Sequence, residues 1–260
     1  MIKYSFAVIT YNSALHIKKC IDSIILYAPT NEYEIIVCDN NSKDTTIDII
    51  KKYNSKYITI IENSKNEGFA TACNQAAKIS KGKFIVFCNS DIFLVNNKVF
   101  VEIDKIFENK KIGCYAPKVL NKNFEEQPST FIFPPTKISL WKSLKNKIRY
   151  KSSAAKLLHY KHISNKPDWV LGAFMVIPTD IFFEIGLFDE KFFLNYEEID
   201  FFWRLQQKGY FIFFDEKNAI VHLNGQCKKK ISFFRLLIIR VRSERYYISK
   251  RSKENNGNCI

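Results

Sequence analysis

Short apolar runs alternate with longer stretches whose apolar residues recur every three or four positions. The apolar runs, each short enough for a buried strand, are residues 4–10, 34–38, 57–61 and 84–88. The intervening stretches, such as 15–25 and 67–80, have the periodicity of amphipathic helices. Strands that alternate with helices predict a parallel sheet with right-handed crossovers. We therefore expect an α/β fold with a Rossmann-like, mostly parallel sheet flanked by helices.

The pattern becomes less regular after residue 95. We expect helices at 97–109 and 198–208, a proline-containing loop region at 113–135, and strands at 168–177, 211–214 and 219–223. Residues 137–160 are expected to form one or two basic helices. The second half of the chain therefore predicts a less regular order of helices and strands than the first half.

Polar clusters follow three of the apolar runs, at the points where the strands are expected to end. They are Thr10-Tyr11-Asn12, Asp39-Asn40-Asn41 and Asn89-Ser90-Asp91. Sheets of this type bind ligands outside the carboxyl ends of their strands. All three clusters are therefore expected to line one rim.

Glycine is scarce, with 8 in 260 residues, so its placement is informative. Gly82, Gly113 and Gly209 precede apolar runs and fit turns. Gly68, at the start of a predicted helix, and Gly172, within a predicted strand, do not fit that role. Glycine at such positions often permits close approach of the backbone to a ligand.

Composition excludes two classes of protein. Hydrophobic residues make up 47% of the chain and charged residues 25%, which excludes a disordered tail and a disulfide miniprotein. The formal net charge of +14 is unusual and first suggests a nucleic acid or an anionic membrane as partner. However, residues 137–166 and 228–253 together carry +18, and the remainder of the chain carries −4. The basic character is therefore local.

The cysteines and the apolar segments indicate the cellular compartment, which we expect to be the reducing cytoplasm. The seven cysteines show no CxxC pair, as expected of small buried side chains in a reducing environment. The N-terminus lacks the apolar core of a signal peptide, and no apolar stretch of about 18 residues suggests a transmembrane helix. We expect a cytoplasmic protein.

Acidic residues and one histidine are candidates for chemistry. Asp91 fits either a turn residue or a ligand of a hard cation. Glu197, Glu198 and Asp200 fit either the acidic first turn of a helix or a site in which one carboxylate is a general base. His222 fits a core histidine or a metal ligand. Taken singly, none of these residues decides between the two interpretations.

The ordered set of motifs resembles the family 2 glycosyltransferases, and most closely their rhamnosyltransferase-like members of bacterial surface-polysaccharide biosynthesis. The motifs, in order, are TYN, VCDNNSKDT, NEGFATACN, FCNSD, DWVLGAFMVI, GLFDEKFFLNYEEIDFFWRL and VHLNGQ. The resemblance covers roughly residues 3–227. It implies the GT-A fold, with a nucleotide-binding half at about 1–95, an acceptor half at about 96–227 that includes the basic helical insert 137–166, and a basic helical C-terminal extension at 228–260.

The resemblance also assigns roles to individual residues. Positions that would bind the nucleotide sugar are Thr10, Tyr11, Asp39, Asn40, Asn66, Gly68, Phe69, Asn74, Asn89, Ser90 and Asp91. Positions that would border the donor sugar or the acceptor are Trp169, Gly172, Ala173, Glu197 and Asp200. Asp91 and His222 would hold Mg2+ or Mn2+, and Glu198 would be the catalytic base. The implied reaction is inverting transfer of a hexose from a nucleoside-diphosphate sugar to a hydroxyl of a glycan or lipid-linked acceptor, as in O-antigen or capsule synthesis.

Three features depart from the commonest family pattern. The DXD-type motif has Asn89 at its first position, and Glu198 stands where Asp is commoner. The QxxRW motif of processive synthases is absent, since Trp203-Arg204 has the reverse order. The addition of one sugar is therefore expected rather than the synthesis of a long homopolymer.

The two basic segments would bring the enzyme to its acceptor at the inner face of the cell membrane. Lys and Arg interspersed with Phe, Leu, Ile and Tyr bind anionic lipid surfaces. Arg235, Arg242 and Arg245 share one side of the second segment when it is drawn as a helix. A solvated helix face, or burial against the body or a partner subunit, would also explain these residues. The oligomeric state is left open.

Other functions would produce part of the same pattern. A sugar nucleotidyltransferase would share the sheet and the metal site, but its usual Gly-rich loop with Lys or Arg is replaced here by TYNSAL. A nucleic-acid-binding module would explain the net charge but not the acidic rim, which would repel phosphates. A catalytically inactive membrane-surface module would also fit the non-consensus NSD and EEID motifs.

Overall fold

The computed structural model describes residues 1–134, 166–223 and 233–257. The first half contains β1 (Tyr4–Thr10), α1 (Ile17–Tyr27), β2 (Tyr33–Asp39), α2 (Thr46–Lys51), β3 (Ile58–Glu62), α3 (Phe69–Ile79), β4 (Phe84–Asn89) and β5 (Ile92–Leu94). Next come α4 (Lys98–Val101), α5 (Ile103–Glu108), β6 (Ile112–Leu120), β7 (Glu126–Gln127) and β8 (Thr130–Phe131). The remainder comprises β9 (Trp169–Val170), β10 (Phe174–Pro178), α7 (Thr179–Glu184), α8 (Glu197–Gln207), β11 (Phe211–His222) and α9 (Phe233–Gly257).

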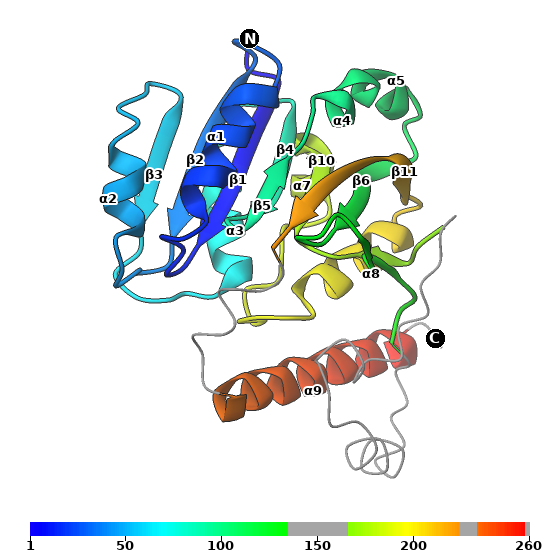
Figure 1. Cartoon of the computed structure of the whole chain (residues 1–260). Coiled ribbons are helices and arrows are strands. Elements are labelled where there is room, and N and C mark those ends of the chain that lie inside the picture. Colours follow the sequence, from blue (N-terminus) through cyan, green and yellow to red (C-terminus); the bar gives the residue numbers. More distant parts are fainter. Residues whose placement is uncertain (135–165, 224–232, 258–260) are drawn as a thin grey trace.

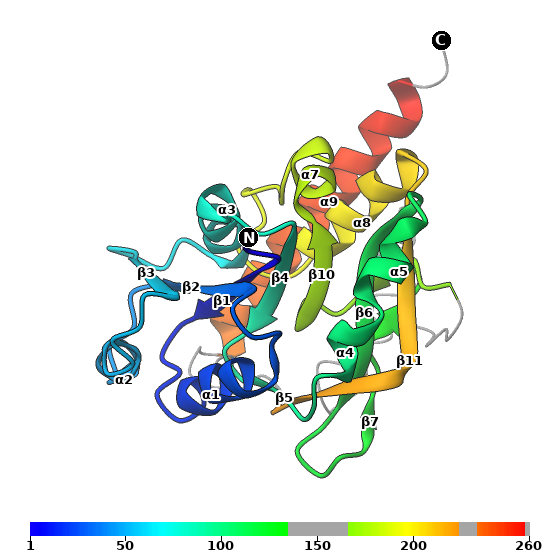
Figure 2. The same ribbon diagram turned by 90° about the horizontal axis from the view of Figure 1, so that it is seen from above.

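One sheet runs through both halves, in the order β3-β2-β1-β4-β10-β6-β11-β5, with β7 added to β6. Strands β3, β2, β1 and β4 are parallel, as the sequence predicts. The next strand, β10, runs antiparallel to both β4 and β6, and β11 is parallel to β6. The sheet is therefore mixed but mostly parallel, with helices on both faces (Figures 1 and 2).

The apolar runs are continuous because both faces of the sheet are covered. In β1, Phe6 and Val8 pack into a core with α1, α4 and α5, whereas Ala7 and Ile9 pack into a second core with α3, α7 and α8. Strands β2 and β4 divide their side chains in the same way. Figure 2 shows the two helix layers on opposite sides of the sheet.

Three local expectations from the sequence are wrong. The region 113–135 was expected to be a loop, but residues 113–120 belong to β6, a long central strand. Pro117 is tolerated there since its partner Asp215 adjoins an irregularity in the ladder. Residues 168–177 form two strands, because β9 pairs with β8 and β10 pairs with β4. Residues 211–222 form one strand with an interruption at 216–218.

The C-terminal extension contains the expected basic helix. Helix α9 lies along the lower side of the body in Figure 1, beneath α8. The expected helical insert at 137–166 lies almost wholly outside the described residues. Among the helices of the described ranges, none is both long and apolar enough to span a membrane.

The described cysteines are buried thiols, as expected. Cys20, Cys38, Cys73, Cys88 and Cys114 are all free and buried. Burial raises the pKa of each of these thiols, to about 12 for Cys38. They therefore act as small apolar side chains.

Candidate active site

The carboxyl ends of β1, β2 and β4 meet at one edge of the sheet. Thr10 is aligned with Asp39, and Ile9 is aligned with Asn89. Across this edge the hydroxyl oxygens of Ser13 and Ser90 lie 2.7 Å apart. The expectation that the three polar clusters share a rim is confirmed.

The β2 end of the rim contains a buried carboxylate. Asp39 is 2% exposed, and the Ser42 backbone N–H donates to its Oδ2 at 2.8 Å. Burial raises the pKa of the Asp39 carboxyl, although hydrogen bonds from Ser42 act in the opposite direction. The neighbouring Thr10 hydroxyl is also buried and has no hydrogen-bond partner among the described residues. Both groups are suited to polar recognition of a ligand at the strand ends, and Tyr11 beside them is partly exposed.

The segment that opens α3 is fixed by hydrogen bonds on both sides of Gly68. The Asn40 amide donates to the Gly68 carbonyl at 3.0 Å, and the Gly68 N–H donates to Asn66 Oδ1 at 3.0 Å. Gly68 has a φ of +92°, and a Cβ there would lie 2.5 Å from the Phe193 carbonyl oxygen. The close approach expected of this glycine is therefore to the protein's own loop before α8. The next N–H, of Phe69, donates to the same Phe193 carbonyl at 2.9 Å.

Asn74 holds the other end of that loop. Its amide nitrogen donates to the Phe188 carbonyl at 2.9 Å and to Glu190 at 3.0 Å, and its oxygen accepts the Phe188 N–H at 3.1 Å. Asn74 is 1% exposed. In this structure it therefore connects α3 to the loop that precedes α8.

Asp91 and His222 lie together at the end of β4. Asp91 is 3% exposed and His222 is 5% exposed. The imidazole Nε2 of His222 is 3.3 Å from Oδ1 of Asp91. The two side chains meet because β11 pairs with β5, which places His222 opposite Ile92. The pairing of a carboxylate with a histidine that the resemblance implies is thus present in the geometry.

The donor atoms of this pair fit a divalent cation. His222 Nε2 is buried and makes no hydrogen bond with acceptable geometry among the described residues, so its lone pair can be directed at an ion. Asp91 and His222 would hold such an ion with two protein ligands, and a bound diphosphate could supply further oxygen ligands. Within residues 1–134, 166–223 and 233–257, no cluster of three or more His, Cys, Asp or Glu side chains could hold a metal alone. Asp91 and His222 are therefore suited to an ion that arrives with its nucleotide.

Gln127 was not among the residues expected at the site. Its side-chain amide lies 3.2 Å from Nδ1 of His222, and its Oε1 is buried without a hydrogen bond in the described part of the chain. If the amide is flipped, Oε1 accepts a hydrogen bond from the Nδ1–H of His222, and the lone pair of Nε2 is then available to a metal. The sequence carries little signal for this contact, since Gln127 lies within the region expected to be a loop.

Glu198 lies in the first turn of α8, facing the segment between β9 and β10. A Cβ on Gly172 would lie 3.8 Å from Glu198 Oε1 and 3.7 Å from the Phe69 ring. The adjacent Ala173 carbonyl accepts the Asn89 N–H at 3.0 Å. Gly172 and Ala173 therefore connect the acid of α8 to the strand end that bears Asp91. Trp169, stacked on Phe131 and donating to the Ile132 carbonyl, supports this segment from the core.

The three acids of the EEID motif have different surroundings. Glu197 is 3% exposed, whereas Glu198 is only partly buried. Asp200 is fully buried and forms ion pairs with Arg204 at 2.8 Å, Lys250 at 2.9 Å and Arg251 at 2.6 Å. Of the three, Glu198 has the surroundings best suited to a proton acceptor that contacts substrate.

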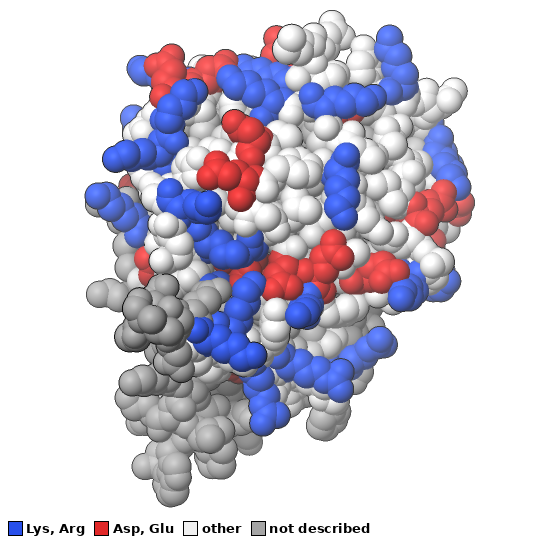
Figure 3. Space-filling view, turned by 180° about the vertical axis from the view of Figure 1, so that it is seen from behind, with Lys and Arg blue, Asp and Glu red and all other residues white. Residues whose placement is uncertain are grey.

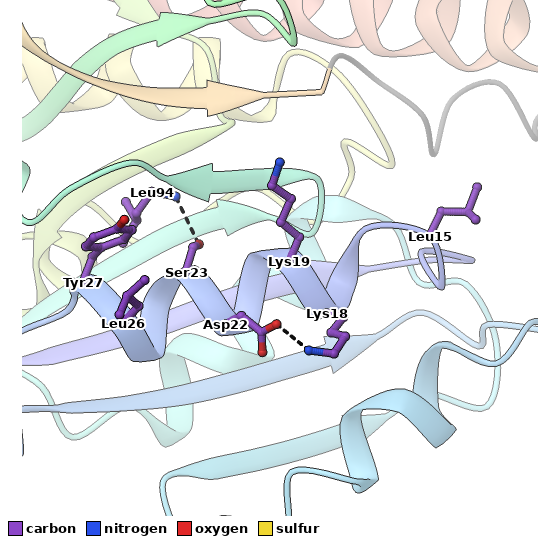
Figure 4. Close-up of a pocket in the computed structure, with 8 residues that line it drawn as sticks. All are labelled: Leu15, Lys18, Lys19, Asp22, Ser23, Leu26, Tyr27 and Leu94. Atoms are coloured by element: carbon purple, nitrogen blue, oxygen red, sulfur yellow. Dashed lines mark hydrogen bonds and ion pairs between the residues drawn. The ribbon is translucent and has the colours of Figure 1, made fainter.

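A surface pocket lies away from these residues. Figure 4 shows it on the outer side of α1, where Leu26, Tyr27 and Leu94 lie at one end and the exposed Leu15 and Lys19 at the other. None of the residues expected at the active site lines this pocket.

Solved structures of glycosyltransferases show which class the fold belongs to. Staphylococcus aureus TarS, solved with UDP-GlcNAc, superposes with a TM-score of 0.62 at 19% identity, covering 93% of this chain and 66% of that one. The mannosyltransferase PcManGT from Pyrobaculum calidifontis, solved with GDP-Man and Mn2+, gives a TM-score of 0.63 at 16% identity, covering 86% and 57%. These similarities establish the GT-A fold.

The chain belongs to glycosyl transferase family 2, whose model matches residues 5–166. A relative of stated activity is the Escherichia coli UDP-Glc:alpha-D-GlcNAc-diphosphoundecaprenol beta-1,3-glucosyltransferase WfaP. It is 37% identical over 120 residues, which are 46% of this chain and 47% of WfaP. The chain spans about half or less of the length of the curated relatives it matches.

Proposed function

We propose that this protein transfers one sugar from a nucleoside-diphosphate sugar to a hydroxyl group of a lipid-linked or polymeric glycan, with inversion at the anomeric carbon. One observation carries the proposal. Asp91 and His222 meet at the end of β4, and the Gly172-Ala173 segment joins that strand end to Glu198. These contacts support the proposal, since a diphosphate bound at Asp91 and His222 would lie on one side of this short segment and Glu198 on the other.

The chain's own residues supply binding and proton transfer. The rim at Thr10, Asp39 and Asn40 would recognise the base and ribose, with Tyr11 beside them. Glu198 would accept the proton of the acceptor hydroxyl as that oxygen attacks the anomeric carbon on the face opposite the diphosphate. Holding donor and acceptor in line lowers the entropic part of the barrier.

Asp91 and His222 would hold the divalent cation. When bound, such an ion neutralises the negative charge that develops on the departing diphosphate. PcManGT, a neighbour solved with Mn2+, supports a divalent cation for this fold. Mg2+ and Mn2+ are both candidates.

The relatives guide the choice of substrates. WfaP is named for transfer from UDP-Glc to a diphosphoundecaprenol-linked GlcNAc, and TarS for transfer of N-acetylglucosamine to poly(ribitol-phosphate). We therefore propose UDP-glucose and UDP-GlcNAc as the first donors to test, and polyprenyl-diphosphate-linked sugars as the first acceptors. A rhamnose nucleotide, which the sequence resemblance implied, is the third donor.

A membrane-linked acceptor would require docking at the inner membrane surface, for which α9 is suited. Its outward face exposes Arg235, Ile238, Arg242 and Arg245, while Leu236, Leu237, Ile239 and Val241 are half-buried. Each basic residue near an anionic surface contributes about 1 kcal/mol. On the opposite side of the molecule from the view in Figure 1, a group of acidic side chains lies between basic ones, so that face is mixed in sign (Figure 3).

The membrane proposal is tested by vesicle sedimentation. Replacing Arg235, Arg242 and Arg245 with Gln should abolish binding to vesicles with anionic lipid at low salt. A matched variant with Lys105, Lys110 and Lys111 changed to Gln loses the same charge from the far end of the body, where these side chains are exposed. Equal loss of binding in both variants would mean that net charge alone attracts the protein.

The transferase proposal is tested with Glu198→Gln. Thermal shift with UDP or UDP-sugars and Mn2+ should show unchanged donor binding, because the stabilisation follows ligand affinity. Release of UDP in the presence of acceptor should fall by at least about a hundredfold, since a positioned base contributes 10²–10⁴-fold. The matched control is Glu108→Gln, an exposed carboxylate at the end of α5. Turnover retained in Glu198→Gln would reject this base, and pyrophosphate as the product would indicate a nucleotidyltransferase.

A further inference from the structure

The inward face of α9 contacts the residues on both sides of Glu197 and Glu198. Ser243, Tyr247 and Arg251 are spaced by four residues, so they share one side of the helix. They are 4%, 1% and 0% exposed, the lowest exposures among the described side chains of α9. A basic helix thus buries three polar side chains against the body.

Each of these three side chains has a defined partner. The Ser243 hydroxyl donates to the Leu194 carbonyl at 3.1 Å, and the Tyr247 ring packs on the Tyr196 ring with centroids 5.4 Å apart. Arg251 pairs with Asp200 Oδ1 at 2.6 Å. The partners are, in order, the end of the loop before α8, its N-cap residue and its first turn.

The backbone between these partners has an unusual conformation. Asn195 and Tyr196 have φ values of +66° and +74°, in the left-handed region that residues other than glycine rarely adopt. Such conformations persist where the surroundings over-determine them. Glu197 and Glu198 follow directly, so their direction depends on how firmly this turn is held.

Arg251 is held by more than charge. Its guanidinium lies 4.8 Å from the centroid of the Trp203 ring in α8 and 5.2 Å from that of Tyr247. A flat guanidinium between two aromatic rings fixes the angle between α9 and α8 in a way that an ammonium group would not. The contact is consistent with α9 lying directly beneath α8 in Figure 1.

A second set of contacts secures the start of the loop. Lys250 donates to Asp189 at 2.7 Å, and the Tyr246 hydroxyl donates to the same carboxylate at 2.9 Å. On the opposite side, Asn74 and Phe69 of α3 bind the loop through Phe188 and Phe193. The loop is therefore held between α3, which opens beside the nucleotide rim, and α9.

We propose that Arg251 is a positioning residue for the transfer reaction, with Asp200 as its partner. The Asp200–Arg251 pair fixes the first turn of α8 so that Glu198 faces the Gly172 segment. Asp200 therefore has a structural role in this pair. The proposal rests on the proposed function insofar as Glu198 is the base. It gives the C-terminal helix a role in catalysis that is separate from membrane docking by its outward face.

The first test compares Arg251→Met, Asp200→Asn and the double variant. Arg251→Met leaves Asp200 with its ion pairs to Arg204 and Lys250, and Asp200→Asn removes the carboxylate that pairs with the buried guanidinium of Arg251. Both changes should lower the melting temperature, while the double change should recover part of the loss. If Arg251 positions α8, kcat in the double variant stays roughly tenfold or more below wild type, while KM for the donor changes less than about threefold. Turnover that returns together with stability would overturn the proposal.

The second test needs no turnover. Hydrogen–deuterium exchange of residues 187–200 should accelerate in Arg251→Met, with β1, β2 and β4 unchanged. Ser249→Met, on the exposed side of the same helix and outside the basic docking residues, is the control and should change neither exchange nor kcat. Unchanged exchange of residues 187–200 in Arg251→Met would overturn the proposal. This measurement does not depend on activity. If Glu198 proves not to be the base, the exchange result still tests whether Arg251 positions α8.

Discussion

The imidazole Nε2 of His222 lies 3.3 Å from Oδ1 of Asp91, and both side chains are almost fully buried. Burying a carboxylate beside a histidine costs free energy unless the pair is satisfied by hydrogen bonds or a metal. The arrangement brings together two residues far apart in the sequence, at the strand end where the sheet is expected to bind its ligand.

Replacing either residue of this pair should weaken metal-dependent nucleotide binding. For Asp91→Asn and for His222→Ala we expect the affinity for UDP in the presence of Mn2+ to fall roughly tenfold or more, because one of two protein ligands is lost. Calorimetry with and without Mn2+ measures the effect. The control is Asp104→Asn, an exposed carboxylate paired with Lys3. Nucleotide binding that is equally tight with and without Mn2+ in wild type would argue against a metal at this pair.

Gln127 should tune the same site through His222. Gln127→Ala removes the group 3.2 Å from Nδ1, so the imidazole loses the contact that sets its tautomer. We expect Mn2+ affinity in the presence of UDP to fall by about tenfold, while the melting temperature without ligand changes little. Gln127→Glu, which can accept from Nδ1, should retain most of the affinity. If the alanine and glutamate variants bind Mn2+ equally well, Gln127 has no part in the site.

The polar rim at the strand ends could be predicted because it depends on local pattern alone. Continuous apolar runs ended by polar residues mark the strand ends, and parallel strands bring those ends to one edge. Thr10, Asp39 and Asn89 are aligned as expected for this reason. The strand order of the second half could not be predicted from local pattern, since the sequence of β6, with Pro117 inside it, resembles that of a loop.

The contacts of α9 were equally hard to predict. Its apolar residues are spread almost all round, so periodicity did not identify the buried face. That face is polar, formed by Ser243, Tyr247 and Arg251. Which acid of the EEID motif would pair with it depends on tertiary packing; Asp200 does so, and this could not be read from spacing.

Gly68 should tolerate alanine poorly. A Cβ at this position would lie 2.5 Å from the Phe193 carbonyl oxygen, and φ is +92°. We expect Gly68→Ala to lower the free energy of unfolding by about 2–4 kcal/mol and to weaken UDP binding, measured by urea unfolding and calorimetry. Gly209 is a matched control, with φ of +85° and nothing within 4 Å of a Cβ. Gly209→Ala should cost about 1 kcal/mol and leave UDP binding unchanged. Equal losses of stability in the two variants would mean that the close contact with the Phe193 carbonyl does not restrict the side chain at position 68.

The contact between α9 and Asp189 should make stability depend on acid pH. Burial raises the pKa of Asp189, but hydrogen bonds from Lys250, the Lys191 N–H and Tyr246 outweigh it and hold the pKa below its usual range. The carboxylate therefore contributes stability above the unfolded pKa of about 3.9, and this contribution is lost as pH falls through the lower, folded value.

Asp189→Asn should accordingly be less stable than wild type at pH 7, and the difference should shrink as pH falls below about 4. Urea unfolding across this range measures the effect. Lys250→Met removes a principal cause of the lowered pKa and should reproduce most of the change, although Lys250 also contacts Asp200. Arg245→Met, on the exposed face of α9, should leave the pH dependence unaltered. A stability difference between Asp189→Asn and wild type that is constant from pH 7 to about pH 3 would show that the charge of Asp189 does not hold the loop to α9.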